Sequence, residues 1–143
     1  ISLNWRDWVF GFAGTIAPLL ASPPSGNPVA PLEICGMLML FGFIFNVSAK
    51  LTLRRSFGVV AANRGVKIGG PYRLIRHPMY AGYTLTQFGF LLSGPTLWNL
   101  GLYGLALSLQ IARILAEERI LSNDPAYAEM SGRVRYRLVP YVF

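Results

Sequence analysis

GPYRLIRHPMYAGYTL, residues 70–85, decides how the chain folds, because here a helix-breaking segment turns into an apolar run. The residue before a proline is disfavoured in the helical region, whereas proline itself suits the first position of a helix. The sequence therefore predicts that His77 is extended and that a helix begins at Pro78 and continues to residue 92.

This helix is too short to cross a bilayer alone. At ~1.5 Å per residue it is roughly 22 Å long, against ~30 Å of hydrocarbon. Either the bilayer thins there, or residues 69–72 and His77 lie below the level of the headgroups. Non-helical backbone is tolerated at that depth where it lines a cavity. A histidine, a tyrosine and helix N-terminal amides would then form a polar ligand site. Alternatively, Arg73 and Arg76 anchor the chain at the interface and His77 caps the helix; the residues alone leave both open.

The composition is that of a membrane protein. The chain has 143 residues, of which 53% are hydrophobic, and its mean hydropathy is +0.44. Only 13% are charged, about half the usual share in soluble proteins. We expect a single-domain, all-α integral membrane protein with about four transmembrane helices.

Apolar runs occupy residues 8–21, 31–53, 78–92 and 97–115, and residues 116–143 would form a cytoplasmic, amphipathic tail. The second and fourth runs approach or exceed the ~20 residues that a crossing needs, whereas the first and third are short. Pro-, Gly- and Ser-rich segments separate the first run from the second and the third from the fourth. The motif Trp5-Arg6-Asp7-Trp8 ahead of the first run is typical of an interfacial anchor.

Charge supports this layout. With four spans, the N-terminus, the loop 54–77 and the tail share one side of the membrane, and the two opposite loops contain no Lys or Arg. The basic residues all fall at the first side: Arg6, Lys50, Arg54, Arg55, Arg64, Lys67, Arg73, Arg76, Arg113, Arg119, Arg133, Arg135 and Arg137. Basic residues mark the cytoplasmic side, so we expect both termini there, in a membrane that the sequence does not identify. Because these residues border spans, they suit anionic headgroups, and no nucleic-acid motif accompanies them.

A second group of polar residues lies near the end of the fourth run. Arg113 and Glu117 are four residues apart, hence on one helix face, and Glu118 follows. The favourable order for a helical ion pair puts the acid first, so helix support alone explains the pair poorly, although Arg113 could also extend to the interface. Ionisable residues within spans are costly and usually functional. Since the third run enters from the side to which the fourth exits, we expect Arg113, Glu117 and His77 to share one site.

Taken together, the motifs GPYRLIRHPMYAGY, RILAEERIL and DPAYAEMSGRVRYRLVP resemble the isoprenylcysteine carboxyl methyltransferase family. The wider group includes the phospholipid N-methyltransferases. The resemblance covers about residues 56–140. It implies a membrane enzyme that uses S-adenosylmethionine, with the cofactor reached from the cytosol and a lipophilic substrate reached from the bilayer.

The resemblance also implies roles for individual residues. Arg113 would hold the substrate carboxylate, and Glu117 would act beside it in catalysis and cofactor binding. The residues that would bind the cofactor are Arg64, Gly65, Val66, Lys67, Tyr72, His77, Pro78, Tyr80 and Glu117.

This chain departs from the family in three respects. The family usually has a tyrosine where Met130 stands, three residues after Tyr127, and the loop NRGVKIGG, residues 63–70, matches only loosely. The chain also has fewer spans than the eukaryotic prenylcysteine enzymes.

The chemistry of carboxyl methylation suits such a site. A carboxylate is ionised at neutral pH, so no general base is needed, and alignment of the reacting atoms is what remains. Opposite charges cancel as the methyl group moves, so a site of low dielectric does not penalise the reaction. One histidine and the distant Cys35, which we expect to be buried, do not form a usual zinc site, so no metal is implied.

Other functions remain open at this point. Membrane sterol reductases carry a similar R-H-P-x-Y motif, and they use NADPH; this chain has no G-x-G-x-x-G fingerprint. A phospholipid amine would suit the same pocket as a prenylated cysteine. A non-catalytic membrane module is the third possibility, but it would have no use for Arg113 and Glu117 beside a short third span.

Overall fold

The computed structural model describes residues 4–54, 66–140 and 142–143, and every regular element in them is a helix. Five α-helices follow in order: α1 (Trp5–Ile16), α2 (Leu32–Leu53), α3 (Pro78–Ser93), α4 (Leu97–Leu121) and α5 (Pro125–Arg133). Two short 3₁₀ helices, η1 (Ala17–Leu20) and η3 (Gly70–Arg73), precede α2 and α3 respectively.

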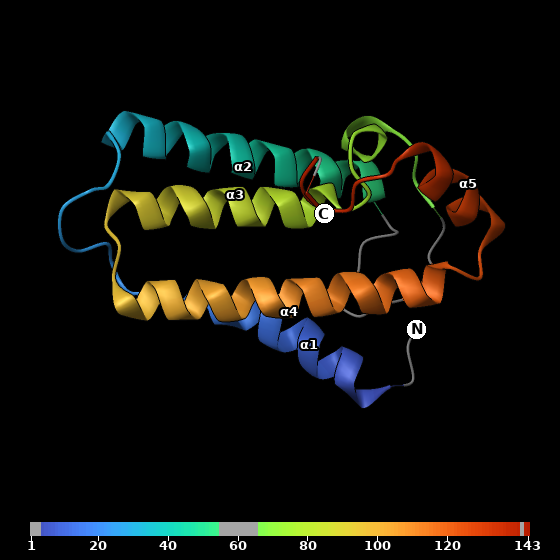
Figure 1. Cartoon of the computed structure of the whole chain (residues 1–143), viewed down its shortest axis with the longest axis horizontal. Coiled ribbons are helices and arrows are strands. Elements are labelled where there is room, and N and C mark those ends of the chain that lie inside the picture. The colour runs from blue at the N-terminus through green and yellow to red at the C-terminus, as the bar shows by residue number, and fades with distance from the viewer. Residues whose placement is uncertain (1–3, 55–65, 141) are drawn as a thin grey trace.

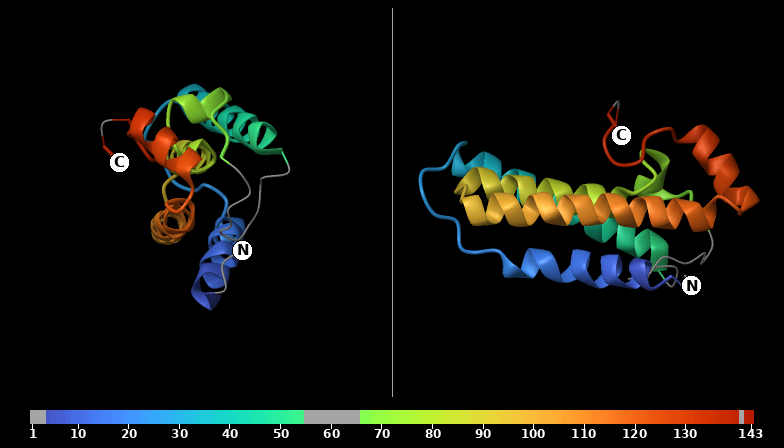
Figure 2. Two further views of the ribbon diagram at one scale, coloured as in Figure 1. Left: turned by 90° about the vertical axis from the view of Figure 1, so that its right-hand side faces the viewer. Right: turned by 60° about the horizontal axis from the view of Figure 1, so that its bottom comes forward.

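Helices α1 to α4 run along the long axis, and each reverses the direction of the one before it (Figure 1). Helix α2 packs mainly on α3, and α1 packs on α4. Figure 2 shows α5 and the segment that follows it at one end of this bundle, where α1 and α3 begin and α2 and α4 end. This end therefore gathers the parts of the chain that the sequence assigns to a shared site.

Among the described residues, α2 and α4 are the helices long and apolar enough to cross a membrane. Much of their surface is left uncovered by the other helices, since 22% of the apolar window of α2 and 44% of that of α4 is buried. Such uncovered apolar surface suits contact with lipid. The predicted first span differs from the structure, because the α-helix ends at Ile16 and a 3₁₀ turn follows it. Pro18 explains this break, since proline lacks the N–H that would continue the helix.

Helix α3 begins at Pro78, as the sequence predicted. His77 precedes it with φ −125° and ψ 60°, outside the helical region, and its side chain makes no capping hydrogen bond. His77 therefore occupies the N-cap position of α3, but its side chain does not cap the helix and is available for other contacts.

Helices α2 and α3 approach closely at glycines. A Cβ atom on Gly82 would lie 2.7 Å from the backbone nitrogen of Asn46 and from the backbone oxygen of Gly42. The Asn46 side chain donates a hydrogen bond to the backbone oxygen of Met79 across the same contact, at 2.8 Å. This packing fixes the first turn of α3, and with it the position of His77, relative to α2. Cys35, also on α2, is fully buried as expected.

Candidate functional site

The C-terminal segment holds the backbone at the start of α3. The N–H groups of Arg76 and His77 donate to the backbone oxygens of Tyr136 and Arg137, each at 2.9 Å. These bonds satisfy donors that have no partner within a helix beginning at Pro78. The imidazole of His77 is thereby held, almost completely buried, between α3, α4 and the C-terminal segment.

Helix α4 brings Glu117 to this imidazole. The Nδ1 atom of His77 lies 3.7 Å from one carboxylate oxygen of Glu117, and the Tyr80 hydroxyl donates to the other at 2.5 Å. The Tyr80 ring lies one turn into α3, 5.9 Å from the His77 ring. The structure therefore brings His77, Tyr80 and Glu117 together in one cluster.

Arg113 joins this cluster from one turn earlier on α4. Its guanidinium carbon lies 5.2 Å from the centre of the Tyr80 ring, a cation–π distance, and the residue is only 7% exposed. Gly14 of α1 lies beside the stem, since a Cβ there would be in van der Waals contact with Cδ of Arg113, at 3.4 Å. A buried guanidinium beside a carboxylate and a tyrosine can recognise a carboxylate or phosphate group.

Glu118 is the centre of a separate network. Its carboxylate accepts hydrogen bonds from Tyr127 at 3.0 Å, from Arg137 at 2.7 Å and from Arg76 at 3.3 Å. The Nε2 atom of His77 lies 3.4 Å from it. Arg76 also donates to the backbone oxygens of Val134 and Ser131. Arg76 therefore ties α5 and the C-terminal segment to α4 and is not a simple interfacial anchor.

The two adjacent carboxylates differ in how they are used. Glu118 accepts from a hydroxyl and two guanidinium groups, and its side chain is 12% exposed, whereas the Glu117 side chain is 21% exposed. A carboxylate offers about four acceptor positions, so Glu117 keeps capacity for a donor or cation from a ligand. Glu117 and Glu118 lie near the C-terminal, negative end of the helix dipole, which is electrostatically unfavourable for a carboxylate. The hydrogen-bond donors around them offset this unfavourable interaction.

Two tyrosines beside the cluster stay protonated. Burial and then the Glu117 charge raise the pKa of Tyr72 above its usual value. Burial and then the Glu118 charge raise the pKa of Tyr127 in the same way. Both hydroxyls therefore stay protonated well above neutral pH and can act as hydrogen-bond donors.

The other predicted cofactor residues differ in how deeply they are buried. Pro78 is fully buried, and Val66 packs against the buried core that contains Tyr72 and Tyr80. Lys67 is exposed. Arg64 and Gly65 lie outside the described residues.

Some residues of the site were not assigned by sequence reasoning. The sequence places Glu118 next to Glu117 and Arg137 among the basic residues of the tail, but it predicts no contact between Glu118 and Arg137. The doublet of acids was a usable signal, because neighbours on a helix point about 100° apart and can face two different partners. No spacing rule connects Arg137 to Glu118, since the intervening chain turns through α5.

The family departure at Met130 also has a structural counterpart. Met130 is buried in the same core as Tyr72, Tyr80 and Tyr127. An apolar side chain therefore fills the position of the family's second tyrosine. Within the described ranges, His, Cys, Asp and Glu do not gather into a group of three or more that could hold a metal ion.

Comparison with known proteins agrees with this geometry at the family level. No curated protein matches the chain significantly. Residues 32–128, from the start of α2 into α5, match the phospholipid methyltransferase family, and this range includes His77, Tyr80, Arg113 and Glu117. The match spans more than half of the chain, which therefore belongs to the phospholipid methyltransferase family, a group of membrane methyltransferases.

Proposed function

We propose that this protein transfers a methyl group from S-adenosylmethionine to a lipophilic acceptor at the membrane, and that the reacting group is a carboxylate such as that of a prenylated cysteine. The observation that carries the proposal is the placement of a partly open carboxylate, Glu117, beside a buried guanidinium, Arg113, with Tyr80 between them. Such a pair can bind a cationic ligand and an anionic ligand side by side.

The residues suit the proposed cofactor. S-adenosylmethionine supplies a methyl group activated by attachment to a positively charged sulfur. Glu117 would offset that positive charge, and the Tyr80 hydroxyl and the His77 imidazole would hold the Glu117 carboxylate in place. Val66, Lys67, Tyr72 and Pro78, together with Arg64 and Gly65, would complete the binding surface.

Arg113 would hold the acceptor. A guanidinium binds a carboxylate through two parallel hydrogen bonds, and this one is already positioned by the Tyr80 ring. A carboxylate needs no proton removed before it attacks. The role of these residues is therefore to orient the acceptor and to exclude water, which their burial favours.

A phospholipid amine is the second candidate, because the matching family is described as phospholipid methyltransferase. The phosphate of such a lipid would also suit Arg113. Its ammonium group, however, must lose a proton before it can accept a methyl group, and it would lie close to a buried cation. The family match favours both candidates over an NADPH-dependent, sterol-reductase-like enzyme and over a non-catalytic module.

The test is to incubate the purified protein with methyl-labelled S-adenosylmethionine and either a prenylated cysteine or phosphatidylethanolamine. A carboxyl methyl ester releases volatile methanol in base, whereas an N-methyl group does not. We expect base-labile label with the prenylated cysteine. Base-stable label in the phospholipid alone would instead support N-methylation, and no transfer to lipid would reject the proposal.

A further inference from the structure

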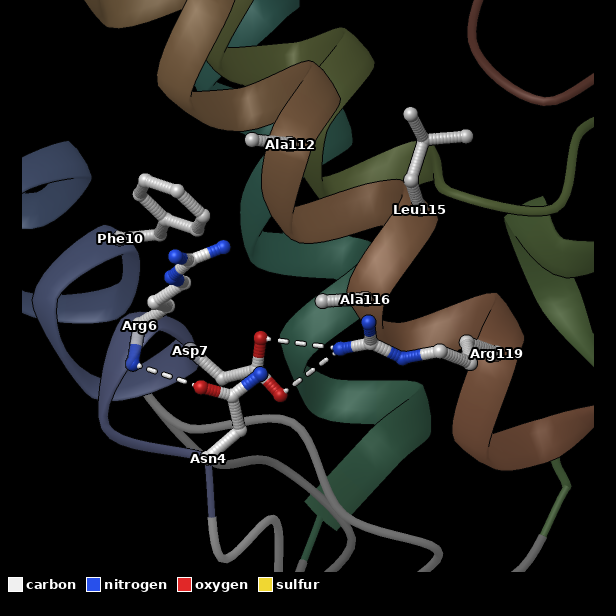
Figure 3. A pocket seen from close by; sticks show the side chains of 8 residues that line it. All are labelled: Asn4, Arg6, Asp7, Phe10, Ala112, Leu115, Ala116 and Arg119. Atoms are coloured by element: carbon white, nitrogen blue, oxygen red, sulfur yellow. Dashed lines mark hydrogen bonds and ion pairs between the residues drawn. The ribbon is translucent and has the colours of Figure 1, made fainter.

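A cavity lies between the beginning of α1 and the end of α4, apart from the cluster around Glu117. Its volume is about 450 Å³, within the range of small-molecule sites. Figure 3 shows the side chains that line it: Asn4, Arg6, Asp7, Phe10, Ala112, Leu115, Ala116 and Arg119. Arg113 and Glu117 are not among them, so this cavity is distinct from the proposed site of methyl transfer.

The lining of the cavity is polar at one end and apolar at the other. The polar residues Asn4, at the N-cap of α1, and Arg6 and Asp7, within it, come before Phe10. On α4, Ala112 and Leu115 come before Arg119. Because α1 and α4 are antiparallel (Figure 1), both polar ends lie at the same end of the cavity. The cavity therefore has the polarity of an amphiphile, with a charged mouth and an apolar floor.

Exposed tryptophans near the charged mouth are suited to a membrane interface. Trp5 and Trp8, which flank the mouth on α1, are 69% and 43% exposed. Exposed tryptophans at a helix end are typical of the headgroup region. Arg6 contacts Trp5 by a cation–π interaction at 5.8 Å, which places its guanidinium at the same level.

The charge of the mouth is positive. Arg119 donates to both carboxylate oxygens of Asp7, each at 3.1 Å, which offsets one cation. Two arginines and one aspartate leave one positive charge in the lining, and Arg6 is accessible as an exposed residue. This excess favours an anionic over a neutral or zwitterionic headgroup.

We propose that this cavity binds an anionic phospholipid, with its phosphate at Arg6 and Arg119 and the start of one acyl chain along Phe10 and Leu115. The site does not depend on methyl transfer. Its occupation would tie the short helix α1 to α4 at the membrane surface and so support the α1 contact with Arg113 at Gly14.

The experiment measures the lipid retained by protein purified in detergent from mixed vesicles of phosphatidylglycerol and phosphatidylcholine, counted by native mass spectrometry. We expect the wild type to retain phosphatidylglycerol preferentially. Arg6→Gln should lower that retention about fivefold, the effect of one basic residue near a membrane. Ala112→Phe, which fills the apolar end without changing charge, should lower it as well.

Arg73→Gln is the matched control, because Arg73 is an exposed cation at the same end of the bundle but outside the cavity. Its retention should equal that of the wild type. An equal loss in Arg73→Gln and Arg6→Gln would show unspecific attraction and overturn the proposal, as would equal retention of both lipids. Thermal stabilisation by glycerol 3-phosphate as large as that by the lipid would overturn it too, by identifying a site for soluble phosphate. None of these readouts requires enzyme activity, so the result is independent of the proposed function.

Discussion

Glu117 and Glu118 are neighbours in the sequence, yet their side chains meet different partners. The Glu117 carboxylate accepts a hydrogen bond from Tyr80 and faces His77. The Glu118 carboxylate accepts hydrogen bonds from Tyr127, Arg137 and Arg76. His77 lies between the two carboxylates, one at each ring nitrogen. A structural network thus stands directly beside a carboxylate that remains partly open.

Glu118→Gln tests the structural role of this residue. The neutral amide leaves Arg76 and Arg137 without their charged partner, so we expect a loss of about 1–3 kcal/mol in the free energy of unfolding, read as a lower melting temperature. Glu129→Gln is the matched control, since Glu129 pairs with Arg133 at 2.6 Å on the exposed surface of α5. Its loss should stay within ~0.5 kcal/mol; equal losses in the two variants would contradict the network.

His77→Ala tests the ligand role of the imidazole. Because the His77 side chain flanks Glu117 and Tyr80 but makes no capping hydrogen bond to α3, we expect the variant to remain helical and to lose binding of S-adenosylhomocysteine, measured by calorimetry. Circular dichroism and size-exclusion chromatography provide the folding control. Unchanged affinity in the folded variant would remove His77 from the cofactor site.

At this scale the sequence predicts the residues that local rules and motifs can reach. The proline after His77 fixes the start of α3, and the four-residue spacing puts Arg113 and Glu117 on one face of α4. The partners of Glu118 lay beyond such rules. Arg137 reaches it only because the chain turns through α5 and returns along the start of α3.

Helices α2 and α3 are held together at the element scale by close backbone contact. Gly42 and Gly82 face each other, and a Cβ on either would lie within 3.0 Å of backbone atoms of the other helix. Small residues at such crossings let membrane helices pack by van der Waals contact and hydrogen bonds. The sequence indicated two helices here, but it did not indicate that their glycines meet.

Gly82→Ala should therefore force α2 and α3 apart. Neither the Asn46 nor the Gly42 backbone can move aside as a flexible side chain could, so we expect a loss of about 1–3 kcal/mol in stability, measured by thermal unfolding in detergent. Gly104→Ala on α4 is the control, because a Cβ there meets nothing within 4 Å. Alanine favours helix at such a site by roughly 0.5–1 kcal/mol, so the control should be neutral or more stable. A neutral Gly82→Ala would refute the close packing.

The helix bounds show where local rules fail. The run at residues 8–21 reads as one continuous segment by hydropathy, but Pro18 interrupts it with a 3₁₀ turn after Ile16. A hydropathy profile reports how apolar a segment is, and it does not register the backbone N–H that Pro18 lacks. Thr96 and Asp124, in contrast, accept hydrogen bonds from the first turns of α4 and α5 and mark their beginnings clearly.

At the scale of the whole molecule, the positive charge of the described residues lies at one end. Among the described residues, the lysines and arginines lie at or beyond the beginnings of α1 and α3 and toward the ends of α2 and α4, the end of the bundle that carries α5 (Figure 1). Helix direction was predictable from the spacing of the apolar runs and their charged flanks. Which helices pack together was not, because apolar residues lie around most of each helix, so hydropathy does not mark the face that each helix buries.

This arrangement predicts that both termini face the cytoplasm. A reporter that is active only in the cytoplasm should be active when it is fused after Phe143, and a reporter active only outside should be silent there. The reverse result would contradict the four-span layout, in which the short helices α1 and α3 also cross.

The central claim is that Glu117 serves the cofactor and Arg113 serves the acceptor, although both lie on one face of α4. The most direct test is a pair of binding isotherms for S-adenosylhomocysteine on Glu117→Ala and Arg113→Ala, after equal melting temperatures have shown both variants to be folded. We expect Glu117→Ala to weaken binding roughly tenfold or more and Arg113→Ala to leave it nearly unchanged while raising KM for the lipid. Equal losses of affinity in the two variants would mean that the residues act as one structural pair, and would contradict the account.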